Sequence, residues 1–145
     1  MIKVYTSSVI DAPAEAVWSQ VRDFNGLPKW TPFVAESRIE GNLAADKIGC
    51  VRNFRLKDGG VIREQLLTLS DYEYQCSYSI LESPMGVTNY VATLKLTPVT
   101  DGNRTFVEWW AEFDCEPAKE RELARNIGQD VFQSGFDSLK SLLRR

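Results

Sequence analysis

The chain has 145 residues, 43% of them hydrophobic, and a formal net charge of −3. This length suits one domain with a hydrophobic core, so we expect residues 1–145 to form a single ligand-binding domain. Because acidic and basic residues are interspersed, we expect no nucleic-acid face and no stable membrane insertion. Residues 1–10 hold one lysine and no long apolar run, which argues against a signal peptide or membrane span and favours a cytoplasmic protein.

The residue composition excludes several kinds of catalytic and metal-binding site. The chain has no histidine, which excludes His-based catalytic triads and His-based metal sites. Cys50, Cys76 and Cys115 are widely spaced and odd in number, which favours reduced, packed thiols over disulfides or zinc ligands. No GxGxxG or P-loop motif is present. We therefore expect no cofactor and no metal, and any chemistry would use carboxylates, arginine, tyrosine, cysteine or hydroxyl groups.

The first part of the chain predicts one strand and two short helices. Residues 3–10 alternate and contain β-branched side chains, which predicts a strand. A helix then begins near Pro13 and places Val17 and Trp18 on one face. Residues 27–33 predict a second short turn or helix.

Six further strands are predicted between residues 34 and 115, each bounded by turn residues such as glycine, proline, asparagine or aspartate. Short links between neighbouring strands require antiparallel hairpins. The predicted strands span residues 34–40, 48–56, 61–70, 74–81, 87–97 and 105–115.

Side-chain alternation predicts which residues face the interior. A three-residue turn at 58–60 would place Arg52, Phe54, Glu64 and Leu66 on one face, whereas a two-residue turn would break that register. Arg52 and Glu64 would then be charges among aromatic side chains on the concave side of a curved sheet. The later strands would direct further aromatic residues to the same side: Tyr78, Tyr90, Trp109 and Phe113.

The last stretch, residues 117–145, predicts one long amphipathic helix with acidic residues at its start and basic residues at its end. The centre of its apolar face includes Gly128, Val131 and Gly135. Because a glycine within a helix costs about 1 kcal/mol relative to alanine, the two glycines need a reason. Either the helix backbone lies close to a strand, or this face roofs a cavity, and the pattern leaves both open.

Several short segments, in this order along the chain, resemble the START-like, or SRPBCC, superfamily, which includes Bet v 1 proteins and polyketide cyclase/dehydrases. The resemblance implies an α+β helix-grip fold: a seven-stranded curved antiparallel sheet wrapped around a long C-terminal helix, with two short helices after the first strand. It also implies a deep hydrophobic cavity for an apolar small molecule. The segments that carry it are Asp11-Ala12-Pro13, Val17-Trp18, Asp23-Phe24, Leu27-Pro28-Lys29-Trp30, Gly49-Cys50-Val51-Arg52, Glu64-Gln65-Leu66, Tyr78-Ser79-Ile80, Asn89-Tyr90, Trp109 and the final helix.

The runs GCVR, E-x-L, SYS and NY-x-AT resemble two branches of this superfamily. Resemblance to plant abscisic-acid receptors implies pocket positions at Thr31, Phe33, Arg52, Glu64 and Tyr90. Thr31 stands where the receptors have the lysine that binds the hormone carboxylate, and the turn near residue 58 is shorter than their gate loop. We therefore do not expect hormone-receptor function. Resemblance to lachrymatory-factor synthase implies that Arg52 and Glu64 form a catalytic pair.

Three functions stay open. In the first, the chain binds a small hydrophobic or amphipathic metabolite, of polyketide, lipid or aromatic acid type, and Arg52 anchors an acidic group of that ligand. Alternatively, it is a cofactor-free polyketide cyclase, dehydratase or isomerase that uses Arg52 and Glu64, or it is a protein-interaction module with a filled core. A monomer and a homodimer are both open. The candidate ligand-binding residues are Phe24, Trp30, Thr31, Phe33, Arg52, Phe54, Glu64, Tyr78, Tyr90, Trp109, Phe113, Gly128, Val131, Phe132 and Gly135.

Overall fold

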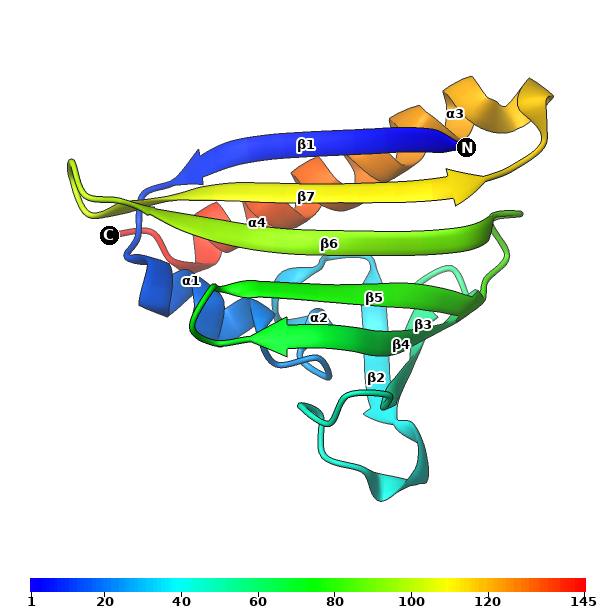
Figure 1. Cartoon of the computed structure of the whole chain (residues 1–145), viewed down its shortest axis with the longest axis horizontal. Coiled ribbons are helices and arrows are strands. Elements are labelled where there is room, and N and C mark those ends of the chain that lie inside the picture. The colour runs from blue at the N-terminus through cyan, green and yellow to red at the C-terminus, as the bar shows by residue number, and fades with distance from the viewer.

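The computed structural model describes all 145 residues. Seven strands form one sheet in the order β1-β7-β6-β5-β4-β3-β2, and every neighbouring pair is antiparallel (Figure 1). This confirms the predicted seven-stranded antiparallel sheet. The strands are β1 (Ile2–Ile10), β2 (Val34–Ile39), β3 (Val51–Leu56), β4 (Val61–Ser70), β5 (Gln75–Glu82), β6 (Thr88–Val99) and β7 (Arg104–Asp114).

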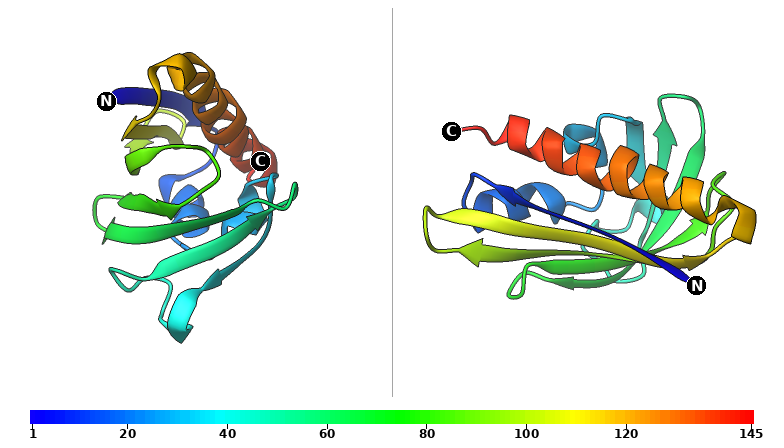
Figure 2. Two further views of the ribbon diagram at one scale, coloured as in Figure 1. Left: turned by 90° about the vertical axis from the view of Figure 1, so that its right-hand side faces the viewer. Right: turned by 90° about the horizontal axis from the view of Figure 1, so that it is seen from above.

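The sheet curves around the C-terminal helical segment, which runs across its concave side (Figure 2). The two predicted short helices after the first strand are present, so the helix-grip arrangement is confirmed. None of the helices combines the length and the apolar character needed to span a bilayer. The helical elements are α1 (Ala14–Val21), α2 (Leu27–Trp30), η1 (Glu40–Asn42), η2 (Pro117–Lys119), α3 (Glu120–Arg125), η3 (Asn126–Gln133) and α4 (Ser134–Leu142).

Helix α1 shows how sequence spacing sets the packing. Ala14, Val17, Trp18 and Val21 are buried, and their spacing places them on one side of the helix. The indole Nε1 of Trp18 donates a hydrogen bond of 2.8 Å to Oδ1 of Asp71 in the turn after β4. The same side of the helix is thus packed against the core and tied to the sheet.

The β3–β4 hairpin has the register that places Arg52 and Glu64 on the same face. Arg52 lies opposite Glu64, and Phe54 lies opposite Ile62. All four residues are buried. The prediction that these residues share one face is therefore confirmed, although the three-residue turn spans 57–59, one residue earlier than predicted.

Most strand boundaries differ from those predicted by one or two residues, and the largest difference is at the start of β3. Strand β3 begins at Val51, and Ile48, the first residue of the predicted strand, lies before it and is 53% exposed. Gly49 lies between them with φ of +93°, a conformation that ends the extended strand. At β2, the strand ends at Ile39, and Glu40 begins the short helix η1.

The C-terminal segment is not one uniform α-helix. It begins with a 3-10 turn, and from Asn126 to Gln133 it is a π-helix. The backbone N–H of Ser134 accordingly donates to the carbonyl of Gln129, five residues earlier. The last α-helix ends at Leu142, before the predicted end at residue 145, and Leu142 itself is 49% exposed. A π-helix turns less per residue than an α-helix, so it changes which side chains point at the sheet.

Candidate functional site

A cavity of about 110 Å³ lies between the concave side of the sheet and the π-helix. Ten of its eleven lining residues are hydrophobic, and Glu64 is the exception. A larger surface hollow of about 200 Å³ is lined only by polar and charged residues of β2 and β3. The apolar cavity is therefore the better candidate for a ligand site. Its lining residues are Phe33, Phe54, Leu56, Ile62, Glu64, Tyr78, Ile80, Met85, Tyr90, Ile127 and Val131.

The cavity has an inner and an outer end. Glu64, Tyr78 and Tyr90 are buried. Five other lining residues are only partly buried, so the cavity meets the surface on their side: Phe33, Leu56, Ile80, Met85 and Val131. The only charged group in the lining is thus at the inner end.

Arg52 and Glu64 form a buried ion pair on strands β3 and β4. Nε of Arg52 donates to Oε1 of Glu64 at 2.8 Å, and Nη2 of Arg52 lies 2.7 Å from the same oxygen. Nη1 of Arg52 donates to the backbone carbonyl of Phe24 at 3.2 Å. Nε and Nη1 of Arg52 thus donate hydrogen bonds, Nη2 makes only an ion-pair contact with Oε1, and no protein group donates to Oε2 of Glu64.

Aromatic rings enclose the guanidinium group. Its central carbon lies 4.0 Å from the centre of the Phe24 ring and 4.7 Å from the centre of the Tyr78 ring. Arg52 is 5% exposed and does not line the cavity. Arg52 thus lies behind Glu64, which corrects the expectation that it anchors an acidic ligand directly.

Burial changes the acidity of the inner polar groups. The apolar surroundings raise the pKa of Glu64 above its ordinary value of 4.5, although Arg52 acts in the opposite direction. Burial, with a smaller effect from Glu64, also raises the pKa values of Tyr78 and Tyr90 well above 10.0. Both tyrosines therefore keep their protons at neutral pH.

The two tyrosines differ in their hydrogen bonding. The hydroxyl oxygen of Tyr78 accepts a hydrogen bond of 3.1 Å from Nε1 of Trp109. The hydroxyl group of Tyr90 makes no hydrogen bond within the protein, and its ring stacks on Phe113 at a centroid distance of 5.5 Å. Tyr90 consequently offers the cavity a free O–H donor.

The two helix glycines are explained by close packing rather than by a cavity roof. A Cβ atom on Gly128 would lie 3.3 Å from Cγ1 of Val4 on β1. A Cβ atom on Gly135 would lie 3.0 Å from the Trp109 ring and 3.1 Å from the Trp30 ring. Neither glycine lines the cavity.

The structure divides the predicted site residues into two groups. Phe33, Phe54, Glu64, Tyr78, Tyr90 and Val131 line the cavity. The others pack around it or fill the neighbouring part of the concave face. Thr31, for example, is 1% exposed and donates its hydroxyl hydrogen to the carbonyl of Leu27. The candidates that do not line the cavity are Phe24, Trp30, Thr31, Arg52, Trp109, Phe113, Gly128, Phe132 and Gly135.

Sequence reasoning missed five lining residues. Leu56, Ile62 and Ile80 lie on the inward face that strand alternation had identified, so this signal was available. Ile127 belongs to the apolar face of the predicted C-terminal helix, so its spacing was also a signal, whereas Met85 lies in the loop between β5 and β6, where no periodic pattern applies.

The model of the family described as "Polyketide cyclase / dehydrase and lipid transport" matches residues 1–144. Two of the similar solved structures cover nearly the whole chain. The protein XoxI from Bacillus cereus is 31% identical with a TM-score of 0.85, covering 99% of this chain and 96% of that chain. A protein from Thermobifida fusca is 30% identical with a TM-score of 0.89, covering 99% of this chain and 93% of that chain.

Curated relatives include plant receptors. Abscisic acid receptor PYL7 from Arabidopsis thaliana is 32% identical over 92 residues, which cover 61% of this chain and 42% of the receptor. Abscisic acid receptor PYL10 from the same plant is 31% identical over 99 residues, covering 66% of this chain and 53% of the receptor. The chain thus matches about half the length of these relatives.

Proposed function

The chain belongs to the polyketide cyclase/dehydrase and lipid transport family, and from this premise we propose that it binds a small, mainly hydrophobic molecule in the cavity between sheet and helix. The family match also confirms the START-like resemblance drawn from the sequence. The observation that carries the proposal is the cavity wall, in which ten of eleven residues are hydrophobic. We further propose that residues 1–145 act as one ligand-binding domain.

The cavity volume limits the bound group. An apolar cavity of about 150 Å³ takes up benzene in another protein, so about 110 Å³ makes a single ring close to the upper limit. Met85 lies at the outer end, and a methionine side chain adapts readily to different shapes. A larger ligand would extend past Met85. An interaction module with a filled core would have no such cavity, so this alternative is less well supported.

Native mass spectrometry of the protein purified from its own host tests the proposal. We expect a small molecule at stoichiometric occupancy, which denaturing analysis would then identify. The variant Val131→Phe narrows the cavity and should lose the molecule. The matched control Leu142→Phe adds the same group at an exposed position of the same helical segment and should keep it. Retention by both variants would contradict binding in this cavity.

A second candidate function is catalysis of proton transfer in the same cavity. Glu64 favours it, because a carboxyl group with a raised pKa in an apolar site suits a general acid or base. Arg52 would act as a positioning residue, since its nitrogens are bonded to Glu64 and Phe24. With any compound that the protein converts, Glu64→Gln should abolish turnover and retain binding. Unchanged turnover in this variant would contradict the catalytic role.

A further inference from the structure

The inner end of the cavity presents an acceptor to a ligand. The hydrogen bond from Nε of Arg52 and the ion-pair contact from its Nη2 both reach Oε1 of Glu64, and no protein group donates to Oε2. Glu64 lines the cavity and Arg52 does not. A ligand that reaches this end therefore meets a carboxylate oxygen before it meets any positive charge.

The charge balance at this end argues against an ionised ligand. Arg52 and Glu64 neutralise one another while both are more than nine-tenths buried. An anionic ligand would bring a second carboxylate beside Glu64 with no free cation to offset it. A cationic ligand would leave one unbalanced positive charge in an apolar cavity. A neutral ligand avoids both costs.

The lining also offers a donor at the same end. The Tyr90 hydroxyl makes no hydrogen bond in the protein, and its O–H stays protonated because burial raises the pKa of this group. A ligand hydroxyl group can donate to one neighbour and accept from another. It therefore matches Glu64 as acceptor and Tyr90 as donor, whereas a methyl or an ether group leaves Glu64 unpaired.

We propose that the cavity selects a neutral alcohol or phenol whose hydroxyl group donates a hydrogen bond to Oε2 of Glu64. This inference rests on the proposed ligand-binding function and adds the chemical class of the ligand. It replaces the aromatic acid expected from the sequence. The hydrophobic remainder of such a ligand would lie against Ile127, Val131 and the aromatic wall.

Three single-ring probes test the proposal: phenol, toluene and benzoate. Phenol and toluene have nearly the same shape and differ in the hydroxyl donor, and benzoate carries the negative charge. NMR titration would follow the methyl signals of Ile127 and Val131, which report on the cavity itself. Because a hydrogen bond to a charged group is strong, we expect phenol to bind about tenfold more tightly than toluene. Benzoate should not perturb these signals.

The outcomes separate this proposal from the general one. Equal binding of phenol and toluene in the cavity would support ligand binding and overturn the proposed hydroxyl selection. Tighter binding of benzoate would also overturn it and would restore Arg52 as an anchor. No methyl perturbation by any probe would contradict ligand binding in this cavity altogether.

Two variants identify the groups responsible. In Glu64→Gln, Arg52 should bind the amide oxygen and turn the amide NH₂ group toward the cavity, so phenol loses its advantage over toluene. Tyr90→Phe removes a single hydroxyl that has no partner in the protein, so the fold should be retained. It should weaken phenol binding by a smaller factor and leave toluene binding unchanged. An unchanged phenol-to-toluene ratio in both variants would overturn the proposal.

Discussion

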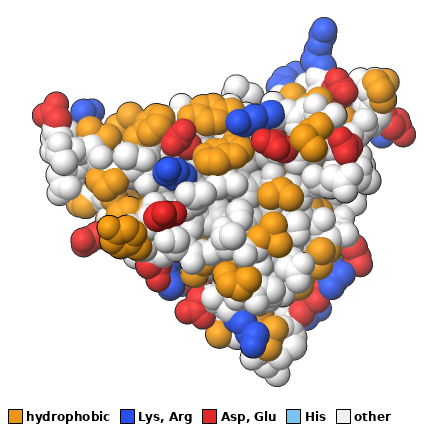
Figure 3. Space-filling view, viewed as in Figure 1, with side chains coloured by type: hydrophobic (Ala, Val, Ile, Leu, Met, Phe, Trp, Pro, Cys, Tyr) orange, Lys and Arg blue, Asp and Glu red, His pale blue; other side chains and the backbone are white.

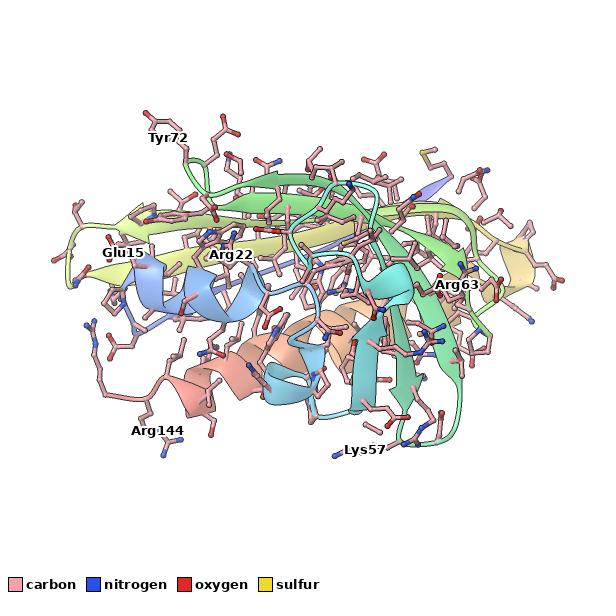
Figure 4. The ribbon with its side chains drawn as sticks, turned by 90° about the horizontal axis from the view of Figure 1, so that it is seen from below. Glu15, Arg22, Lys57, Arg63, Tyr72 and Arg144 are labelled. Atoms are coloured by element: carbon pink, nitrogen blue, oxygen red, sulfur yellow. The ribbon has the colours of Figure 1, made fainter.

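Strand β4 contributes to two ion pairs, one on each face of the sheet. Arg52 and Glu64 face the helix, with side chains 6% and 8% exposed. Arg63, next to Glu64 in sequence, faces outward and pairs with Glu40 at 2.7 Å, with side chains 29% and 27% exposed. Arg63 also contacts Glu82 at 2.9 Å. Figure 4 shows Arg63 beside β3 and β4, at the end of the molecule away from α1.

The same chemical groups behave differently on the two faces. Hydrogen bonds from Arg63 and Asn53 lower the pKa of Glu40 from 4.5 to about 2. Burial instead raises the pKa of Glu64. On the outer face, charged and hydrophobic side chains are mixed, as Figure 3 shows, and water remains close. The outer pair therefore fits a structural role. Burying the two charges of the inner pair costs desolvation free energy, and a functional role would explain why the pair is kept.

The largest predicted effect follows from breaking the inner pair. Arg52→Ala leaves Glu64 buried without its partner, which should lower the free energy of unfolding by about 3–5 kcal/mol. Arg63→Ala should cost much less, because water can replace its partners at the partly exposed carboxylates. Urea denaturation of both variants measures the difference.

The double variant Arg52→Met with Glu64→Leu separates charge from packing. It removes both charges and keeps hydrophobic volume, so it should recover most of the stability lost in Arg52→Ala. Equal losses in Arg52→Ala and Arg63→Ala would show that the inner pair is no more sensitive than the outer one.

A smaller loss of stability is expected when the tyrosines of the inner face are replaced by phenylalanine. Tyr78→Phe removes the acceptor of the Trp109 indole N–H and leaves a buried donor unpaired, which should cost about 1–3 kcal/mol. Tyr90→Phe removes a hydroxyl without a protein partner and should change stability little. Thermal and urea unfolding provide the comparison. A greater loss of stability in Tyr90→Phe than in Tyr78→Phe would contradict the hydrogen bonding described for the two hydroxyl groups.

The smallest predicted effect is on the pH dependence of folding stability, to which Glu64 and Glu40 should contribute with opposite trends. Because the folded pKa of Glu64 is raised above 4.5, its stabilising contribution is complete below that pH and is lost as pH rises through the folded value. The folded pKa of Glu40 is lowered to about 2, so its contribution is present above 4.5 and is lost as pH falls toward 2.

Unfolding free energies of the wild type, Glu64→Gln and Glu40→Gln at several pH values measure these trends. The difference between the wild type and Glu64→Gln should fall as pH rises, and the difference for Glu40→Gln should rise. Parallel trends would mean that the two faces impose the same environment on their carboxylates.

Strand alternation was enough to predict the inner pair. A three-residue turn keeps Arg52 and Glu64 on one face because side chains alternate along strands, and the turn lies one residue earlier than predicted, which brings the two residues directly opposite. The number and antiparallel pairing of the strands followed from short turns between them. The boundary at β3 was wrong because the left-handed conformation of Gly49 is not visible from residue periodicity.

The cavity wall was harder to predict than the fold. A uniform helical wheel placed Gly128, Val131 and Gly135 at the centre of the apolar face and left open whether the glycines meet a strand or a cavity. In the structure Ile127 and Val131 line the cavity, and Gly128 lies against Val4 of β1. That Arg52 lies behind Glu64 also depends on side-chain contacts with Phe24, which alternation does not determine.

A crystal structure of the protein with bound phenol tests the central claim most directly. The account predicts one phenol molecule in the cavity, with its ring against Ile127 and Val131 and its oxygen within hydrogen-bonding distance of Oε2 of Glu64, while Arg52 keeps its bonds to Oε1. Phenol bound only outside the cavity, or bound with its oxygen turned away from Glu64 toward Met85, would contradict it.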